Sequence, residues 1–303
     1  MTRRGRDADC PDQGRGSVGT VLKLISRLPL PVLYMLAWLV YALSYHVFRF
    51  RKRLTCSNLR DAFPQMGQRE VRVIAKRCYR QFADVLVETV KSMTIQESEI
   101  RRRVRIANPE VLEGLRGAVA GQAVLFLAAH QCNWEWLLLA SRLVCPFPVD
   151  AVYKPARNPM IDRLLVERRA RFGGSLIPVD RFIAEVMRRH DGPRGLALVA
   201  DQTPRVEEDK YWTRFMGLDT AFYVGPQKIA AMKKAPVYFV AMRRLQRGYY
   251  EVSFERLAVP PYSMEDHDVV EVYVRAVERQ VRAAPHDWLW MYKKWKYRKP
   301  LYA

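Results

Sequence analysis

The chain has 303 residues, 50% of them hydrophobic, and it carries a formal net charge of +20. This length and composition exclude a globally disordered protein and allow either one large domain or two small ones. The charge favours a polyanionic partner: nucleic acid, an anionic membrane, a phosphorylated substrate or an acidic carrier protein.

Residues 1–20 are charged and rich in glycine, and we expect a flexible basic tail there. They contain a formal G-x-G-x-x-G pattern at Gly14, Gly16 and Gly19. Dinucleotide binding requires such glycines between a strand and a helix of a βαβ unit, and no strand pattern precedes them in this chain. The pattern therefore does not indicate a nucleotide site.

A hydrophobic membrane-anchor helix is expected over residues 21–50. From Leu28 to Phe48, 21 consecutive residues include no Lys, Arg, Asp or Glu, which is long enough to span a bilayer. The segment lies too far from the start, and lacks a small-residue cleavage site, to be a removable signal peptide. Basic residues on both sides leave open whether the helix crosses the membrane or lies in its interface, and a buried core helix is the other alternative.

Residues 51–303 are expected to form one further domain. Helical spacing of apolar residues predicts a long amphipathic helix over 67–93 and shorter helices over about 134–144, 159–172, 180–190 and 265–283. Short apolar runs predict buried strands at 124–129, 151–153 and 196–200, and a closely connected antiparallel pair at 237–242 and 249–254. Because strands and helices alternate, we predict an α/β fold whose mixed, largely parallel sheet is flanked by helices.

Three of the predicted strands end at polar residues, namely His130, Lys154 and Asp201. In open α/β sheets, ligands bind beyond the carboxyl ends of the strands. We therefore expect these three residues to face one crevice.

The segment HQCNWE places His130 and Glu135 five residues apart, directly after a predicted strand. Five residues turn a continuous helix by about 140°, so both side chains cannot share one helix face. The spacing works if His130 lies in the loop and Glu135 in the first helical turn, with Asn133 as N-cap. The carboxylate would then orient the imidazole, which accepts a proton from a hydroxyl.

The five cysteines show neither a C-x-x-C pair nor a histidine at zinc-site spacing. We therefore expect no disulfide framework, no metal and no cofactor, and a reducing compartment for this domain. Cys132 is a conceivable nucleophile beside His130, but a thiol next to a strand end is more often a packing residue. No serine lies in a G-x-S-x-G elbow.

The pattern H-x4-[DE] is the signature of glycerolipid acyltransferases. The longer segment AAHQCNWEW resembles the lipid A biosynthesis lauroyl and myristoyl acyltransferase family, whose members often carry H-x-G-N-W-E-W. The similarity continues, in the order of that family, through FADVLVETVKSMT, VYKPARNPMIDRLLVERRARFGGSLIP, ADQTP and DWLWMYKKWK. It covers residues 20–299 and implies a glycerolipid-acyltransferase-like fold.

The resemblance implies that His130 and Glu135 are the catalytic pair. The functional arginine of the family falls on Arg169, and its strand-end aspartate falls on Asp201, followed by Gln202. Arg169 would hold a phosphate or stabilise an oxyanion, and Asp201 would orient that arginine. The residues alone favour a solvated helix face for Arg169, beside other arginines, and a helix-capping or turn role for Asp201.

Asn133 and Lys154 are further candidates for binding the substrate or the oxyanion. The chain departs from the family at Lys154, where members commonly have Y-R-P, and at residues 290–296, where they have W-x-H-x-R-W-K. Both departures keep positive charge, so they put the identity of the acceptor in doubt more than the type of reaction.

The C-terminal run 288–299 interleaves aromatic and basic side chains, as single-stranded nucleic-acid binders do. The same composition suits a membrane surface, where Trp and Tyr lie at headgroup level and Lys and Arg meet anionic lipid. Because the anchor already places the protein at a bilayer, we favour an anionic membrane or lipid phosphate and expect no nucleic acid. A basic nucleic-acid- or membrane-binding protein without catalysis is the alternative of a different class.

The resemblance implies an acyltransferase in the bacterial inner membrane, with its catalytic domain on the cytoplasmic side. It would move a fatty acyl chain from an acyl thioester, carried by acyl carrier protein, to a hydroxyl of a lipid A precursor or a related glycolipid. The cationic surface fits that acidic donor protein. Another lipid, or an intermediate of a specialised lipid or pigment pathway, is the alternative acceptor.

Overall fold

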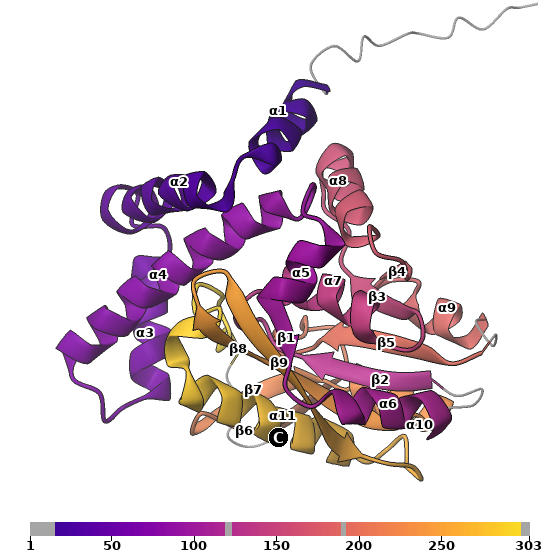
Figure 1. Cartoon of the computed structure of the whole chain (residues 1–303). Coiled ribbons are helices and arrows are strands. Elements are labelled where there is room, and N and C mark those ends of the chain that lie inside the picture. Colours follow the sequence, from indigo (N-terminus) through magenta and orange to yellow (C-terminus); the bar gives the residue numbers. More distant parts are fainter. Residues whose placement is uncertain (1–15, 119–122, 189–191, 298–303) are drawn as a thin grey trace, which may run out of the picture.

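The computed structural model describes residues 16–118, 123–188 and 192–297, and it is built around a seven-stranded sheet (Figure 1). The strand order is β1-β9-β8-β2-β5-β3-β4, and all neighbours in this sheet pair in parallel except β8 and β9. The strands are β1 (Val104–Ile106), β2 (Ala123–Ala128), β3 (Val149–Tyr153), β4 (Leu176–Pro178), β5 (Arg194–Val199), β8 (Val237–Gln246) and β9 (Tyr249–Ala258). The predicted α/β class, with its largely parallel sheet and antiparallel pair, is confirmed.

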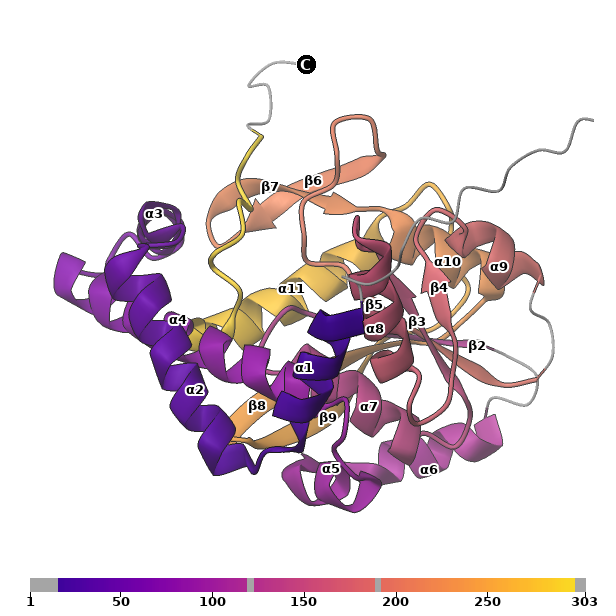
Figure 2. The same cartoon turned by 90° about the horizontal axis from the view of Figure 1, so that it is seen from above.

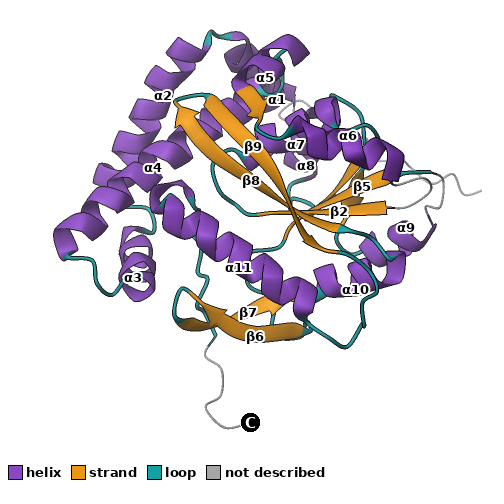
Figure 3. Cartoon of the chain, turned by 60° about the horizontal axis from the view of Figure 1, so that its bottom comes forward, coloured by secondary structure: helices purple, strands orange, loops and turns teal. Residues whose placement is uncertain are grey.

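The central strand β2 is buried on both faces. Because successive strand residues point to opposite sides, Phe126 lies in one core cluster and Leu127 in the other. Figure 3 shows α10 and α11 on one side of the sheet and α5, α6 and α7 on the other. This double burial explains the uninterrupted apolar run AVLFLA, which is typical of a parallel strand covered on both sides.

The predicted helices are found close to their expected bounds. The observed helices are α3 (Lys52–Ala62), α4 (Gln68–Lys91), α5 (Glu97–Arg103), α6 (Pro109–Ala118), α7 (Trp134–Val144), α8 (Pro159–Arg169), α9 (Phe182–Arg188), α10 (Gly225–Lys233) and α11 (Asp268–Ala283). Sequence reasoning missed α3, α5, α6 and α10, the short strands β1 and β4, and the separate hairpin β6 (Lys210–Phe215) and β7 (Leu218–Tyr223). Strands of three residues carry too few positions for a period to show.

The N-terminal helices lie against the rest of the molecule. Residues 1–15 of the expected tail lie outside the described residues, and α1 (Gly16–Arg27) begins within the range expected for that tail. The helix α2 (Leu30–Ala42) follows and continues into a π-helical turn, η1 (Leu43–Val47). Within the described part of the chain, Leu30–Val47 is the one helix long and apolar enough to cross a membrane.

The helix α2 packs along α4 by one face (Figure 2). Leu33, Ala37 and Tyr41 are buried in that contact, whereas Met35 on the other face is 73% exposed. The predicted anchor therefore contributes both to the hydrophobic core and to an exposed apolar surface.

The structure describes residues 288–297 of the C-terminal run, and this part is not uniformly the solvent-facing aromatic and basic surface that we expected; residues 298 and 299 lie outside the described residues. Trp288, Trp290 and Lys294 are buried, with relative exposures of 4%, 0% and 2%. The two indole rings pack in the core on the α11 side of the sheet. Their N–H donors, and the amino group of Lys294, find acceptors inside the protein, which is why polar aromatic and basic residues can be buried there.

Candidate active site

The register between β2 and β5 brings His130 and Asp201 together. The two strands run parallel, with Ala128 opposite Val199. The same offset, continued by two residues, places His130 beside Asp201 just beyond the carboxyl ends of the strands. Asp201 donates no proton here; it accepts hydrogen bonds from His130 Nδ1 at 2.6 Å and from the His130 backbone N–H at 3.0 Å.

The Asp201 carboxylate is held in place from behind by the C-terminal run. Trp288 Nε1 donates a hydrogen bond to Asp201 Oδ2 at 2.8 Å, and Lys294 Nζ donates to the backbone carbonyl of Asp201 at 2.8 Å. Burial alone would raise the pKa of Asp201, but the neighbouring His130 and the hydrogen bonds from His130 and Trp288 outweigh it and lower that pKa. The carboxylate is therefore ionised at neutral pH and suited to stabilise an imidazolium.

The other imidazole nitrogen, Nε2 of His130, lies near the amide of Gln202, at 3.4 Å from its Nε2. The His130 side chain is 18% exposed and lines a cavity of about 510 Å³ together with Trp134, Glu135 and Gln202. Beyond these residues the wall is mainly apolar, with Phe126, Leu137, Leu138, Val149, Leu176, Val179, Phe182, Ile183, Ile229, Met232 and Val240 among its members. A base in the wall of a mainly apolar cavity can act on a hydroxyl that approaches a bound hydrocarbon chain.

Glu135 lies in the first turn of α7 but does not orient His130 as we expected. Its carboxylate accepts a hydrogen bond from Arg168 Nη2 at 2.9 Å and two from Arg169, from Nη2 at 2.6 Å and from Nε at 2.9 Å. Burial opposes ionisation, but the hydrogen bonds and charges of Arg169 and Arg168 lower the pKa of Glu135. Asp201, not Glu135, contacts His130 Nδ1. We predicted that Glu135 orients the histidine and Asp201 the arginine; in the structure, Asp201 contacts the histidine and Glu135 contacts the arginine.

Arg169 belongs to this site and is not part of a solvated helix face. Its guanidinium is clamped by Glu135 in a bidentate pair and lines the same cavity as His130. The neighbouring Arg168 is 4% exposed and also pairs with Glu135. Lys154, at the end of β3, lines the cavity too and is exposed.

The loop that carries His130 is fixed by its neighbours along the chain. Asn133 caps α7, as predicted, because its Oδ1 accepts a hydrogen bond from Trp136 N at 2.9 Å. Cys132 adopts a positive φ of 53°, and its backbone N–H donates to Asp287 O. Burial raises the pKa of the Cys132 thiol well above its ordinary value, so it is a packing residue and not an activated nucleophile.

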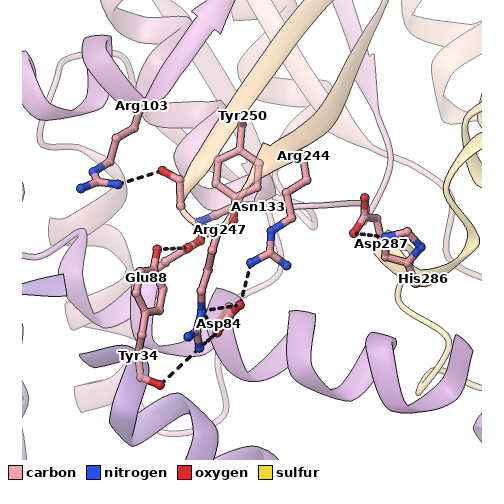
Figure 4. A network of polar contacts seen from close by, with 11 residues as sticks. Tyr34, Asp84, Glu88, Arg103, Asn133, Arg244, Arg247, Tyr250, His286 and Asp287 are labelled. Atoms are coloured by element: carbon pink, nitrogen blue, oxygen red, sulfur yellow. Dashed lines mark hydrogen bonds and ion pairs between the residues drawn. The ribbon is translucent and has the colours of Figure 1, made fainter. Parts of the chain in front are cut away.

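A buried carboxylate, Glu88 of α4, supports this loop from the core (Figure 4). It accepts hydrogen bonds from Asn133 Nδ2, Tyr34 Oη and Tyr250 Oη, each at 2.6 Å. Burial raises the pKa of Glu88 despite these donors. Through Tyr34, the network connects α2 to the loop that carries His130.

The sequence analysis did not predict that four buried residues support the groups around His130. These residues are Glu88, Arg168, Trp288 and Lys294. One signal was available for Glu88, since an acidic residue interrupts the apolar segment VLVETV. Burial lowers the pKa of Lys294 to about 7, but nothing in a run of basic residues distinguishes the one that becomes buried.

Comparison with known proteins gives consistent matches over the chain. Residues 17–297 match the model of the family described as bacterial lipid A biosynthesis acyltransferase. The chain is 25% identical over 284 residues to a lipid A biosynthesis lauroyltransferase of Escherichia coli (strain K12), covering 92% of this chain and 90% of the relative. It is 22% identical to a lipid A biosynthesis acyltransferase of Shigella flexneri, covering 92% and 89%, and 22% identical to one of Haemophilus influenzae, covering 80% and 75%.

Proposed function

Because the chain belongs to the bacterial lipid A biosynthesis acyltransferases, we propose that it transfers a fatty acyl chain from an acyl thioester to a hydroxyl of a lipid A precursor or a related glycolipid. The enzyme is an acyltransferase, as its relatives are named. The observation that carries the detailed proposal is that His130, paired with the buried Asp201, lines a mainly apolar cavity.

In this mechanism, Nε2 of His130 removes the proton of the acceptor hydroxyl while Asp201 holds Nδ1 and stabilises the imidazolium. The hydroxyl oxygen attacks the thioester carbonyl and forms a tetrahedral intermediate. When the intermediate collapses, the C–S bond breaks and the departing thiolate takes the proton back from His130. The products are an ester and a free thiol.

Arg169 is suited to the negative charge that arises in this reaction. Its guanidinium is held toward the cavity by Glu135, so it is preorganised for an oxyanion or for a phosphate of either substrate. Gln202 and Lys154 line the same cavity and are further candidates for contacting the acceptor.

We further propose acyl carrier protein as the donor and the inner membrane as the location, with the catalytic domain on the cytoplasmic side. The net charge of +20 supports docking of an acidic carrier. The exposed apolar face of α2 supports attachment to a bilayer. Burial of Trp288, Trp290 and Lys294 weakens the observation that favoured a non-catalytic nucleic-acid-binding protein.

The test is to measure acyl transfer by purified enzyme and by its His130→Ala variant, with acyl carrier protein thioesters as donors and extracted lipids analysed by mass spectrometry. We expect the variant to lose about 10² to 10⁴ in turnover, the usual contribution of general-base catalysis. Turnover near that of the wild type in folded His130→Ala would overturn the mechanism. A new acyl ester on a lipid other than a lipid A precursor would be consistent with the same mechanism, but it would contradict the proposed acceptor.

A further inference from the structure

A second groove, of about 600 Å³, opens where α2, α4 and the β8–β9 hairpin meet. Its lining comes from four separate segments of the chain: Ala37, Trp38, Tyr41, Arg77, Arg80, Asp84, Arg244, Arg247 and His286. None of these residues lines the cavity at His130. The groove is therefore distinct from the proposed acyl-transfer site.

Two of its arginines are held by one buried carboxylate. Asp84 of α4 is 4% exposed and accepts hydrogen bonds from Arg244 Nη2 at 2.6 Å and from Arg247 Nε at 3.0 Å (Figure 4). These ion pairs fix the orientation of both guanidinium groups at the groove wall. Arg244 also interacts electrostatically with Glu88 and Asp287, so the positive charge of this pair is largely balanced.

The other two arginines carry no compensating charge. Arg77 and Arg80 lie on the face of α4 that also presents Asp84, at spacings of three and four residues. Both are exposed, and within the residues that the structure describes no carboxylate pairs with either. Arg80 lies over the ring of Tyr41 of α2, 5.1 Å from its centroid. Four guanidinium groups thus line one groove. Asp84, Glu88 and Asp287 act on the Arg244 side, whereas Arg77 and Arg80 have no carboxylate partner among the described residues, an arrangement that suits a phosphate.

The position of the groove indicates which phosphate it meets. Two of its lining residues, Trp38 and Tyr41, belong to α2, whose outer face exposes an apolar stripe made of Val32, Met35, Leu36, Leu39 and Leu43. Trp and Tyr concentrate at the headgroup level of bilayers, and arginines near that level attract anionic lipid. We propose that this groove binds the phosphate of an anionic membrane-lipid headgroup, as a docking site separate from the acyl-transfer cavity.

The test compares binding of the full-length protein to vesicles of phosphatidylcholine alone and to vesicles that also contain phosphatidylglycerol. The variant is Arg77→Gln/Arg80→Gln, which removes the two exposed charges and leaves the buried Asp84 pair intact. A matched control is Arg116→Gln/Arg256→Gln, which removes two exposed arginines of α6 and β9. Co-sedimentation measures vesicle affinity, and glycerol 3-phosphate serves as a soluble phosphate ester in competition.

We expect the groove variant to bind phosphatidylglycerol vesicles about tenfold or more weakly than the wild type. The reason is that each basic residue near an anionic membrane surface contributes to the free energy of binding. Its binding to phosphatidylcholine vesicles should not change, and the control should lose less than about twofold, because charges far from the contact are screened. Equal losses in both variants, or no loss in either, would overturn the proposal. Release of the wild type by glycerol 3-phosphate at low millimolar concentration would assign the groove to soluble phosphate esters.

Lipid docking at this groove does not depend on acyl transfer. An experiment can therefore contradict the docking site without contradicting the proposed acyl transfer, and the reverse. In detergent, the groove variant should keep the turnover of the wild type while His130→Ala loses it. If Arg77→Gln/Arg80→Gln lost turnover as severely as His130→Ala, the groove would belong to the acceptor site and the docking role would be wrong. If the wild type transferred no acyl chain at all, the vesicle comparison would still decide the docking site.

Discussion

The His130 imidazole depends on one carboxylate for its orientation. Asp201 contacts Nδ1 at 2.6 Å, whereas Glu135 is committed to Arg168 and Arg169. We expect Asp201→Asn to lower turnover by about 10² to 10⁴, because an amide can leave the base in the wrong tautomer and cannot stabilise its charged form. Steady-state turnover, with thermal unfolding to confirm folding, measures the effect. Near-normal activity of folded Asp201→Asn would contradict an orienting role for Asp201 and would favour Glu135 in that role.

Lys294 is a second residue whose behaviour depends on its environment. Burial lowers its pKa to about 7, while a lysine in the unfolded chain titrates near 10.4. The folded protein thus favours the neutral amine. As the pH falls from about 10 toward 7, the unfolded chain takes up a proton first, and stability is lost across that window. Below about pH 7 both states are charged and the loss stops.

We therefore expect Lys294→Met to flatten the rise in free energy of unfolding between about pH 7 and pH 10 relative to the wild type. The exposed neighbour Lys293 offers a matched control, since Lys293→Met should keep the slope of the wild type. Urea unfolding followed by tryptophan fluorescence at several pH values measures these slopes. The same slope in Lys294→Met and in the wild type would show that the amine is charged in the folded protein.

At the scale of elements, two helices of this domain begin with an asparagine cap in different surroundings. Asn158 caps α8 at the exposed surface, accepting from Met160 N at 2.9 Å. Asn133 caps α7 in the interior and also donates to the buried Glu88 carboxylate. The two positions allow the cost of a cap to be separated from the cost of the buried network.

We expect Asn158→Ala to cost about 1 kcal/mol of folding free energy, the usual loss of an N-cap. Asn133→Ala should cost about 2–4 kcal/mol, because it also leaves the buried Glu88 carboxylate without one of its donors. Urea unfolding of both variants under one condition gives the comparison. Equal losses would mean that Glu88 contributes nothing to holding the loop that carries His130.

At the scale of the whole molecule, α2 joins the core to the proposed membrane surface. Deleting residues 1–50 would test the anchor if the segment were independent of the rest. In this structure the deletion would also remove Leu33, Ala37 and Tyr41 from the core, and Tyr34 from Glu88. Substitutions on the exposed face are therefore the cleaner test.

We expect Met35→Ser/Leu39→Ser to lower the membrane-bound fraction under high salt, with at least tenfold weaker partitioning. Each large apolar side chain contributes about 1.5–3 kcal/mol when it is fully removed from water. The folded state should be unaffected because both positions are exposed. Leu33→Ser, at a buried position of the same helix, should instead lower the melting temperature. Unchanged partitioning of Met35→Ser/Leu39→Ser would remove α2 from the proposed membrane contact.

The longer strands and helices of this protein follow from its sequence alone, whereas four helices, the shortest strands and the β6–β7 hairpin do not. Apolar runs and helical periods predicted the parallel strands around β2 and the helices α4, α7 and α11, because those patterns depend on which face of an element is buried. The polar residues at strand ends were likewise expected to share one crevice, since parallel strands end at one edge of a sheet. His130 and Lys154 line one cavity, whereas Asp201 is buried behind the imidazole and does not line that cavity.

Only the tertiary structure decided which charged groups meet. The strand register pairs His130 with Asp201, and the packing of α8 brings Arg169 to Glu135; no spacing along the chain encodes either contact. Burial of Lys294 and Trp288 depends in the same way on segments far away in sequence. The free energy of burying a polar or charged side chain depends on the protein groups that replace its water. The same residue type therefore lies on the surface in one place and is buried in another, according to the fold.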